Sequence, residues 1–441
     1  MIKNDPVSDM SPLAQFIHRI QNTKPPQKGI FSVCTAHHPV LENCVKFAAQ
    51  NSQYLVLEST SNQVNHQGGY TGLTPKEFET HVRSLAKKFN LGQDRLLMGG
   101  DHLGPYPWRH LPAAQAMREA KAMVQEYVRA GFQKIHLDTS MPLGDDEFNC
   151  MLPPHLVASR AAALCEAAEE AATCSSNVRG DICYVIGTEV PDPGGVTGKH
   201  QRPHATSPAK AEETIEVTKE AFYMQDLQDA WDRVVAVVVQ PGIEFGNRVI
   251  FDYQPHQTQE LTNFIASYPN LVYEAHSTDF QTSRALKHLV RDAFAILKVG
   301  PWLTYTYRET MVALEEIEKE FLDGANIELS ELQSTIHQVM LERPGSWIEY
   351  YTGDEQDQAL DRIFSFSDRV RYYWTDDRLQ KSVNRLISNL TANPPPLTLI
   401  SQYLPRQYEK VRMNQLLPSP QDLIQDSIFR VLDMYHKACE Q

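Results

Sequence analysis

The feature that most constrains the fold of this sequence is a set of eight short apolar segments. Each segment ends in small or polar residues and is followed by a longer amphipathic stretch. Apolar runs of this length are typical of strands that are buried on both faces, and strands that alternate with helices form a parallel sheet. Eight strands indicate closure into a TIM (β/α)8 barrel, with an open, doubly wound sheet as the alternative. The segments span residues 30–37, 54–62, 95–104, 134–140, 182–190, 234–242, 270–279 and 294–301.

The chain of 441 residues is longer than the roughly 250 residues that one barrel needs. After residue 322 the sequence is mostly helical in pattern, and its last stretch begins a helix at Ser419, just before Pro420. We therefore expect a helical lead-in (1–28), a barrel (29–322) and a helical C-terminal extension packed on the barrel (323–441). The extension carries the aromatic cluster Tyr372, Tyr373 and Trp374, which could pack in the interior, cover a pocket or build an interface.

Composition excludes several classes of protein. The net charge of -14 disfavours nucleic-acid binding. No run of 18 apolar residues occurs and the N-terminus has no apolar core of a signal peptide, so we expect neither a membrane span nor secretion. Seven scattered cysteines without a CxxC pair fit a reducing compartment. The sequence predicts a cytoplasmic protein.

Polar side chains gather at the carboxyl ends of the predicted strands, where barrel enzymes carry their sites. Side chains alternate along a strand, so Lys134, His136 and Asp138 share one face while Ile135 and Leu137 share the other. We expect the polar face to point into the barrel. A purely structural network of ion pairs is the alternative, although burying so many charges is costly unless they pair or bind something. The same alternation puts Glu58 with Thr60, Gly187 with Glu189, and Glu274 with His276, and it sets Lys298 opposite Leu297 and Val299.

The segment GGDHLG is the strongest local indication of a functional site. Residues 99–100 are glycines that would let the backbone approach a ligand closely. Asp101 is a candidate proton carrier beside His102, and Glu189 and Lys134 are further candidates for acid–base chemistry.

A divalent metal is the cofactor that these residue types favour. His102 and His276 could both ligate it, with Glu58 or Glu189 as the carboxylate partner, and this donor set suits Zn²⁺. A pair of hydrogen-bonded histidines without metal is the alternative.

A phosphate group is expected at the loops after the seventh and eighth strands, where barrels commonly bind one. The backbone around Ser277, Thr278 and Gly300 lies at predicted helix starts, which suit an anion, and Lys298 would add positive charge.

Sugar hydroxyls are expected at the amide-rich loop 62–72, led by Asn62 and Gln63, with Glu58 and Asp138 as further ligands. A turn-rich loop that only packs on the barrel is the alternative.

Two other chemistries fit poorly. Lys134 and Lys298 could form a Schiff base, but this needs a lowered pKa and carboxylates nearby would raise it. The segment GGVTGKH (194–200) resembles a P-loop but lacks its first glycine and has His200 after the lysine. A kinase built on that motif is not supported.

Taken together, these motifs resemble the accessory, non-catalytic subunit of class II D-tagatose-1,6-bisphosphate aldolase. The resemblance runs over nearly the full chain, including the helical extension. Its segments are GIFSVCTAH (29–37), ESTSNQVNHQGGYTGLTP (58–75), GGDHLGP (99–105), KIHLDTSM (134–141), YVIGTEVP (184–191), VVQPGIEF (238–245), VYEAHSTDFQT (272–282), AILKVGP (295–301), SDRVRYYW (367–374) and SQYLP (401–405).

The resemblance implies a barrel related to class II aldolases and a role in galactitol, tagatose or N-acetylgalactosamine breakdown. It implies a separate catalytic aldolase subunit as partner and a sugar phosphate as ligand. Class II aldolases place an Asp–His pair after a barrel strand, with the histidine on zinc; Asp101 and His102 look like that pair and His276 looks like a later ligand. The sixth strand ends VVVQPG and offers no further histidine.

Three hypotheses follow. The chain is an accessory subunit that stabilises its catalytic partner; or it is itself a metal-dependent 4-epimerase of fructose 6-phosphate and tagatose 6-phosphate, as some relatives are regarded to be; or it is a metal-free sugar-binding protein. Whether it forms a homo-oligomer or only a mixed complex stays open.

Overall fold

The computed structural model describes residues 15, 28–147, 152–173, 182–187 and 202–440. Eight parallel strands close into a barrel in the order β1-β10-β9-β6-β5-β4-β3-β2, which confirms the TIM barrel and excludes the open sheet. The barrel strands are β1 (Ile30–Cys34), β2 (Leu55–Thr60), β3 (Leu96–Leu103), β4 (Lys134–Leu137), β5 (Cys183–Ile186), β6 (Val234–Val238), β9 (Val272–Ala275) and β10 (Ile296–Val299). A small antiparallel hairpin, β7 (Glu244–Phe245) and β8 (Ile250–Phe251), follows β6.

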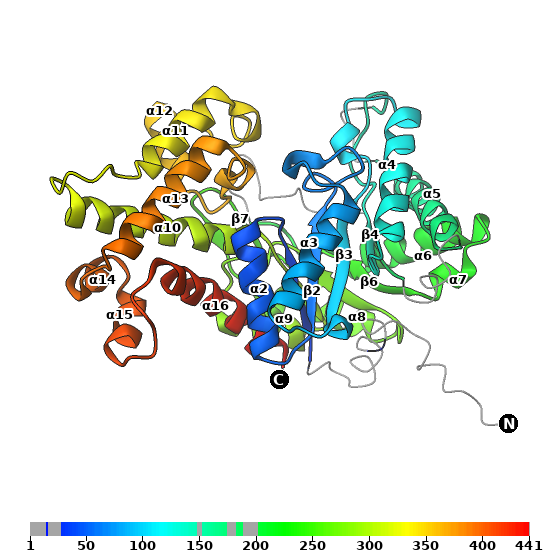
Figure 1. Cartoon of the computed structure of the whole chain (residues 1–441). Coiled ribbons are helices and arrows are strands. Elements are labelled where there is room, and N and C mark those ends of the chain that lie inside the picture. Colours follow the sequence, from blue (N-terminus) through cyan, green and yellow to red (C-terminus); the bar gives the residue numbers. More distant parts are fainter. Residues whose placement is uncertain (1–14, 16–27, 148–151, 174–181, 188–201, 441) are drawn as a thin grey trace.

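Helices between the strands cover the outside of the barrel (Figure 1). Several begin at a hydroxyl cap, as sequence rules predict: Thr74 forms a capping box with Glu77, and Ser207 and Thr282 cap the helices that follow them. These helices are α2 (His38–Gln50), α3 (Pro75–Lys88), α4 (Ala113–Arg129), α5 (Pro154–Thr173), α6 (Pro208–Met224), α7 (Gln228–Trp231), α8 (Gln259–Ile265) and α9 (Ser283–Arg291).

The C-terminal extension forms a helical lobe beside the barrel (Figure 1). The long helix α10 (Pro301–Leu322) leads from β10 into this lobe. The lobe contains α11 (Leu332–Glu342), α12 (Glu355–Phe364), the 3-10 helix η6 (Arg369–Tyr372), α13 (Asp377–Ala392), α14 (Leu397–Tyr403) and α15 (Pro405–Arg412).

The last helix, α16 (Pro420–Cys439), returns to the barrel and packs against α2, α9 and α10. Gly29, just before β1, donates a backbone hydrogen bond of 2.9 Å to Cys439. The Tyr435 hydroxyl lies 2.9 Å from the hydroxyl of Thr278, at the end of β9. The extension therefore supplies part of the outer helical layer, so the barrel and the extension share one core.

The lower part of the barrel interior is apolar and the upper part is polar. The apolar cluster consists of Ile30, Val56, Leu97, Cys183, Val185, Val235, Ala236, Val238, Val272, Ala295 and Ile296. Above this cluster, Lys134 and His136 on β4 and Glu274 on β9 are fully buried. The predicted alternation on β4 is confirmed, because Ile135 and Leu137 belong to the core between the barrel and its helices.

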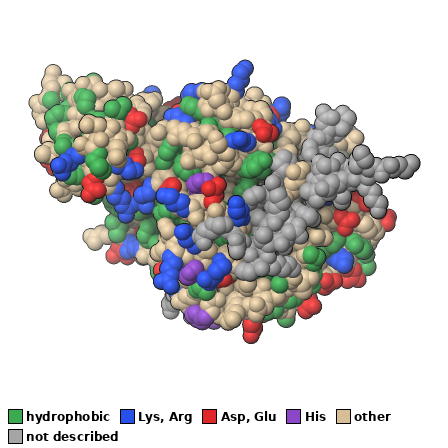
Figure 2. All heavy atoms as spheres, turned by 90° about the horizontal axis from the view of Figure 1, so that it is seen from below, with side chains coloured by type: hydrophobic (Ala, Val, Ile, Leu, Met, Phe, Trp, Pro, Cys, Tyr) green, Lys and Arg blue, Asp and Glu red, His purple; other side chains and the backbone are tan. Residues whose placement is uncertain are grey.

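Within the described residues, no helix is both long and apolar enough to cross a membrane. The face in Figure 2 mixes basic, acidic and apolar side chains over its described part. The described cysteines are unpaired, and Cys44, Cys165, Cys183 and Cys439 are buried, as expected for small core residues.

Candidate active site at the mouth of the barrel

Lys134 is the centre of a buried charged layer inside the barrel. Its Nζ lies 2.6 Å from Oε1 of Glu58 on β2 and 2.7 Å from Oε2 of Glu274 on β9. All three side chains are at most 1% exposed. Charges so far from water are tolerated only because they pair with one another.

Gly99 on β3 makes this pairing possible. In the sheet register Gly99 lies between Glu58 on β2 and Lys134 on β4. A Cβ on Gly99 would lie 2.8 Å from Cγ and 2.9 Å from Oε1 of Glu58. The missing side chain at Gly99 therefore makes room for Glu58, whereas the sequence suggested that it would let a ligand approach the backbone. Gly100 likewise has no room for a Cβ, because the side chain of Leu103 occupies that space.

Lys298 on β10 joins this layer to the groups above it. Its Nζ contacts Glu58 and lies 3.0 Å from Oδ2 of Asp101. Burial lowers the pKa of Lys298 to about 7, while the two carboxylates favour its charged form. An amine with this pKa can take up or release a proton close to neutral pH.

A bulge at the end of β3 turns both Asp101 and His102 toward the site. Adjacent residues of a regular strand point to opposite faces, but the register shifts between Gly100 and Leu103, and His102 has a φ of 47°. This left-handed backbone costs about 1–3 kcal/mol for a residue with a side chain. Such strain at a strand end is a feature of functional sites.

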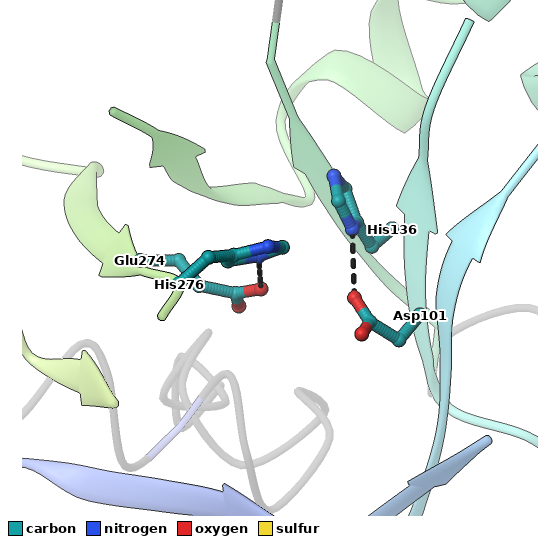
Figure 3. Close-up of side chains that lie close together, drawn as sticks. All are labelled: Asp101, His136, Glu274 and His276. Atoms are coloured by element: carbon teal, nitrogen blue, oxygen red, sulfur yellow. Dashed lines mark hydrogen bonds and ion pairs between the residues drawn. The ribbon is translucent and has the colours of Figure 1, made fainter. Parts of the chain in front are cut away.

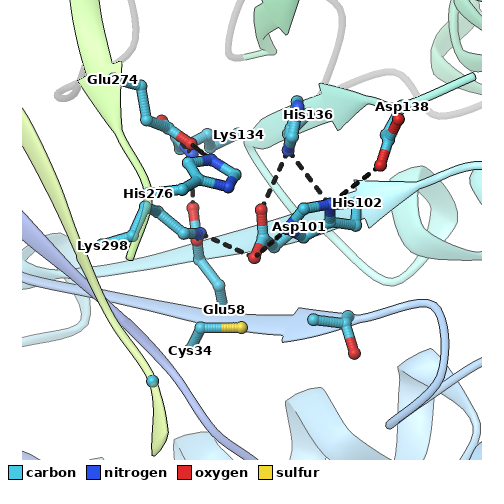
Figure 4. Close-up of polar contacts among 12 residues, drawn as sticks. Cys34, Glu58, Asp101, His102, Lys134, His136, Asp138, Glu274, His276 and Lys298 are labelled. Atoms are coloured by element: carbon cyan, nitrogen blue, oxygen red, sulfur yellow. Dashed lines mark hydrogen bonds and ion pairs between the residues drawn. The ribbon is translucent and has the colours of Figure 1, made fainter. Parts of the chain in front are cut away.

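Three imidazoles then converge with Asp101 at the mouth (Figure 4). The ring centroids of His102 and His276 lie 4.9 Å apart, and that of His136 lies 5.2 Å from each. The third imidazole of this group comes from β4, and not from the sixth strand. The set of possible ligand atoms that lie together includes His136 and His276 but not His102, which the sequence suggested as a ligand.

The electrostatics of this group are dominated by ion pairs. Burial opposes ionisation of Asp101, but the charges of the surrounding histidines hold its pKa well below the usual value. Burial also opposes the charged form of His102, yet Asp101 and Asp138 raise the pKa of His102 to about 9. Nδ1 of His102 lies 2.9 Å from Oδ2 of Asp138. Burial lowers the pKa of His276.

A divalent cation fits the donors that meet here. One ligand atom from each of Asp101, His136, Glu274 and His276 lies within 4.8 Å of the others (Figure 3). Nδ1 of His136 is 2.9 Å from Oδ1 of Asp101, while its Nε2 is buried without a hydrogen-bond partner. An imidazole that donates one N–H to a carboxylate presents the other nitrogen as a metal ligand. Two nitrogen and two oxygen donors suit zinc and neighbouring divalent metals.

A cavity of about 600 Å³ opens above this cluster. Asp101, His102, His276 and Lys298 form part of its wall, together with Asn62 and Gln63 of the loop after β2 and Cys34 of β1. This size is within the range of small-molecule sites, and a few convergent polar groups are what such sites use to orient a ligand.

The extension closes one side of the same cavity. Arg371 and Tyr372 of η6 line it, as does Trp374. Tyr372 packs edge-on against Tyr70 of the loop after β2, with ring centroids 4.8 Å apart. Tyr373 and Trp374 are only 4% and 2% exposed, so the aromatic cluster both packs in the interior and borders the pocket.

The other predicted residues are distributed as follows. Ser277 and the backbone of Gly300 line the cavity. The Gly300 amide donates a bond of 3.0 Å to Asp279, and Thr278 is buried, its hydroxyl donating to the carbonyl of Lys298. Glu189 and the segment 194–200 lie outside the described residues.

Sequence reasoning missed His136 and Glu274 as members of the candidate metal-ligand cluster, and Arg371 as a wall of the site. The position of His136 was signalled, because the alternation in KIHLDTS already turned it inward. Nothing local signals Arg371, since it reaches the barrel through the packing of the extension.

Comparison with solved structures gives one close match to this fold and two weak ones. A probable tagatose 6 phosphate kinase from Sinorhizobium meliloti 1021 superposes with a TM-score of 0.84 and 40% identity, over 93% of this chain and 100% of that one. The YdjI aldolase from Escherichia coli K12 aligns with a TM-score of 0.43 and 12% identity, over 87% of this chain and 100% of that one. The fructose-bisphosphate aldolase of Campylobacter jejuni aligns with a TM-score of 0.42 and 12% identity, over 86% of this chain and 91% of that one.

The family described as D-tagatose-1,6-bisphosphate aldolase subunit GatZ/KbaZ-like matches residues 13–440. The match spans the barrel and the extension, and the predicted resemblance is confirmed. This chain belongs to the GatZ/KbaZ-like family of D-tagatose-1,6-bisphosphate aldolase subunits.

Proposed function

We propose that this chain is the accessory subunit of a D-tagatose-1,6-bisphosphate aldolase and supports the activity and stability of a separate catalytic subunit. Its pathway context is the breakdown of galactitol, tagatose or N-acetylgalactosamine. The observation that carries this proposal is the family match over residues 13–440, which includes the extension as well as the barrel.

The pocket at the barrel mouth is proposed to bind a sugar phosphate together with a divalent metal, Zn²⁺ being the first candidate. His136 and His276 would hold the ion with Asp101 and Glu274, and His102 stands beside them. When bound, such an ion polarises a carbonyl oxygen and stabilises negative charge that develops there.

A second candidate function is the 4-epimerisation of fructose 6-phosphate and tagatose 6-phosphate. The observation that favours it is the acid–base apparatus itself, because a scaffold does not require Asp101, Lys298 and the histidines in one cavity. In a retro-aldol route the C4 hydroxyl would lose its proton to Asp101, with Lys298 in contact to share it, and the C3–C4 bond would break to leave an aldehyde at C4 and an enolate on the C1–C3 fragment. After the aldehyde turns its other face, C3 of the enolate would attack C4 and re-form the bond. Asp101 would return the proton to the C4 oxygen.

The accessory role is tested by co-expression with a catalytic tagatose-bisphosphate aldolase subunit. We expect the two chains to co-purify, and the catalytic subunit to lose activity faster on warming when this chain is absent. Bovine serum albumin at equal mass is the control for nonspecific protection. Equal half-lives with and without this chain would contradict the accessory role.

The epimerase is tested separately by incubating the metal-loaded chain alone with fructose 6-phosphate. Formation of tagatose 6-phosphate, lost in Asp101→Asn, is the expected result. No product with Zn²⁺, Mn²⁺, Co²⁺ or Mg²⁺ would exclude it while leaving the accessory role standing.

A further inference from the structure

We propose that Arg371, which the C-terminal extension brings to the barrel mouth, is the residue that binds the phosphate group of the ligand. This inference rests on the proposed sugar-phosphate function of the pocket. It assigns the extension a direct part in ligand recognition, beyond packing against the barrel.

Arg371 is hydrogen-bonded to neutral groups of its own segment. Its guanidinium donates to the carbonyls of Ser367 and, at 3.1 Å, Asp368, and to the hydroxyl of Tyr372 at 3.0 Å. Among the described residues it makes no ion pair with a carboxylate. Some arginines nearby are paired: Arg308 of α10 with Asp368 at 2.6 Å, and in the extension Arg343 with Asp376 at 2.6 Å and Arg378 with Glu342 at 2.7 Å. Arg369 of the same 3-10 helix also makes no ion pair within the described residues, but it does not line the cavity.

A half-buried guanidinium that borders a cavity and has no carboxylate partner favours an anionic ligand. Its planar fork matches the oxygens of a phosphate better than an ammonium group does. The wall that Arg371 forms also contains Asp101 and His276 on the barrel side. A phosphate on Arg371 would therefore place the sugar between the extension and the acid–histidine cluster.

Four other basic groups that line the cavity are less suited to a phosphate, and one of them, His102, already pairs with Asp138 at 2.9 Å. Lys298 already pairs with Glu58 and Asp101. Burial lowers the pKa of His37 to about 3, and burial also lowers the pKa of His81. These two imidazoles are consequently neutral at pH 7, whereas Arg371 keeps its charge.

The start of α10, where barrel enzymes commonly bind phosphate, is already filled by a carboxylate. Oδ1 of Asp279 accepts the amide of Gly300 at 3.0 Å and the amide of Trp302 at 2.9 Å. The hydroxyl of Thr278 is likewise used within the protein. An incoming phosphate would have to displace Asp279 to reach these donors, and no such displacement is needed at Arg371.

Tyr372 and Tyr70 hold this arginine at the mouth. The Tyr372 hydroxyl accepts from Arg371, and the Tyr372 ring packs on Tyr70, which lies in the loop after β2. Burial alone would raise the pKa of Tyr372, but the guanidiniums of Arg371 and Arg369 outweigh burial and lower it. The arginine is thus positioned before any ligand binds, which reduces the entropic cost of binding.

The test is isothermal titration of the full chain with inorganic phosphate, fructose 6-phosphate and fructose, in buffers matched for ionic strength. Arg371→Met is compared with Arg371→Lys and with the control Arg378→Met, whose arginine lies outside the cavity wall. We expect Arg371→Met to weaken phosphate and fructose 6-phosphate binding by about tenfold or more. Arg371→Lys should weaken it severalfold, and Arg378→Met should bind like the wild type.

Fructose should bind equally to all four proteins, because it carries no phosphate. Undiminished phosphate affinity in Arg371→Met, or no phosphate binding by the wild-type chain, would overturn the proposal. If Arg371→Met does not fold, the comparison of Arg371→Lys with Arg378→Met decides in the same way. Because binding is measured directly, the result is independent of aldolase support and of epimerisation.

Discussion

His136 Nδ1 lies 2.9 Å from Asp101 Oδ1, and the opposite nitrogen of the same ring is buried without a hydrogen-bond partner. The same Nδ1 also faces the backbone N–H of His102 at 3.2 Å. When Nδ1 carries the proton, it donates to Asp101 and Nε2 offers a lone pair. An unsatisfied buried nitrogen costs free energy, and a bound metal ion would remove that cost.

Substitution of the histidines should therefore lower the metal content. We expect His276→Gln and His136→Gln to retain less than about one tenth of the divalent metal of the wild type, in line with the effect of losing a ligand or its support. Inductively coupled plasma mass spectrometry after gel filtration measures this. The control is His288→Gln, whose residue lies on α9 away from the cavity wall; equal metal in all three variants would rule out this site.

Removal of the Lys134 charge should destabilise the barrel. Lys134→Met leaves Glu58 and Glu274 buried beside an apolar side chain, so we expect the free energy of unfolding to fall by about 3–5 kcal/mol. Urea denaturation followed by circular dichroism measures it. Lys121→Met is the matched control, because Lys121 and Glu166 form an exposed pair and its loss should change stability by less than about 1 kcal/mol.

A methyl group at Gly99 should disturb the same layer from another side. We expect Gly99→Ala to lower the free energy of unfolding by about 1–3 kcal/mol, since the new Cβ would overlap the Glu58 side chain. Gly345→Ala, where a Cβ would meet nothing within 4 Å, should leave stability nearly unchanged. Similar denaturation midpoints for the two variants would show that Glu58 can move aside freely.

Asp279 should make stability depend on pH. Burial raises its pKa to about 6 from 3.8, although the amides of Trp302 and Gly300 and the charge of Arg371 oppose this. A folded-state pKa above the unfolded value means a stabilising contribution that is complete below pH 4 and is lost as the pH rises through 6.

We therefore compare the free energy of unfolding of the wild type with that of Asp279→Asn. The wild-type value minus the variant value should rise by on the order of 2–3 kcal/mol as the pH falls from 7 to 4. Urea titrations of both proteins at several pH values measure this difference, in which the titrations of other groups cancel. A difference that stays constant with pH would mean that Asp279 remains ionised throughout.

Much of the fold was predictable because it depends on local periodicity. All eight predicted segments contain the barrel strands, since parallel strands leave short apolar runs and helices leave amphipathic ones. The inward set on β4 was predictable for the same reason, as strict alternation fixes which side chains share a face.

The details of the site depend on departures from that regularity. The bulge that turns both Asp101 and His102 inward has no local signal, because it arises from pairing with β4. The path of Glu58 over Gly99 toward Lys134 also requires three strands in register. Arg371 and Tyr372 reach the cavity only through packing of the extension, which no sequence window contains.

Residues on or next to β3, β4, β9 and η6 are proposed to form one site for a divalent metal and a sugar phosphate. The most direct measurement is a crystal structure with Zn²⁺ and fructose 6-phosphate, with data collected at the zinc absorption edge. We predict an anomalous peak between His136 and His276, with the phosphate against Arg371. If zinc or the sugar phosphate binds elsewhere and neither is found in this cavity, the result would contradict the proposed site.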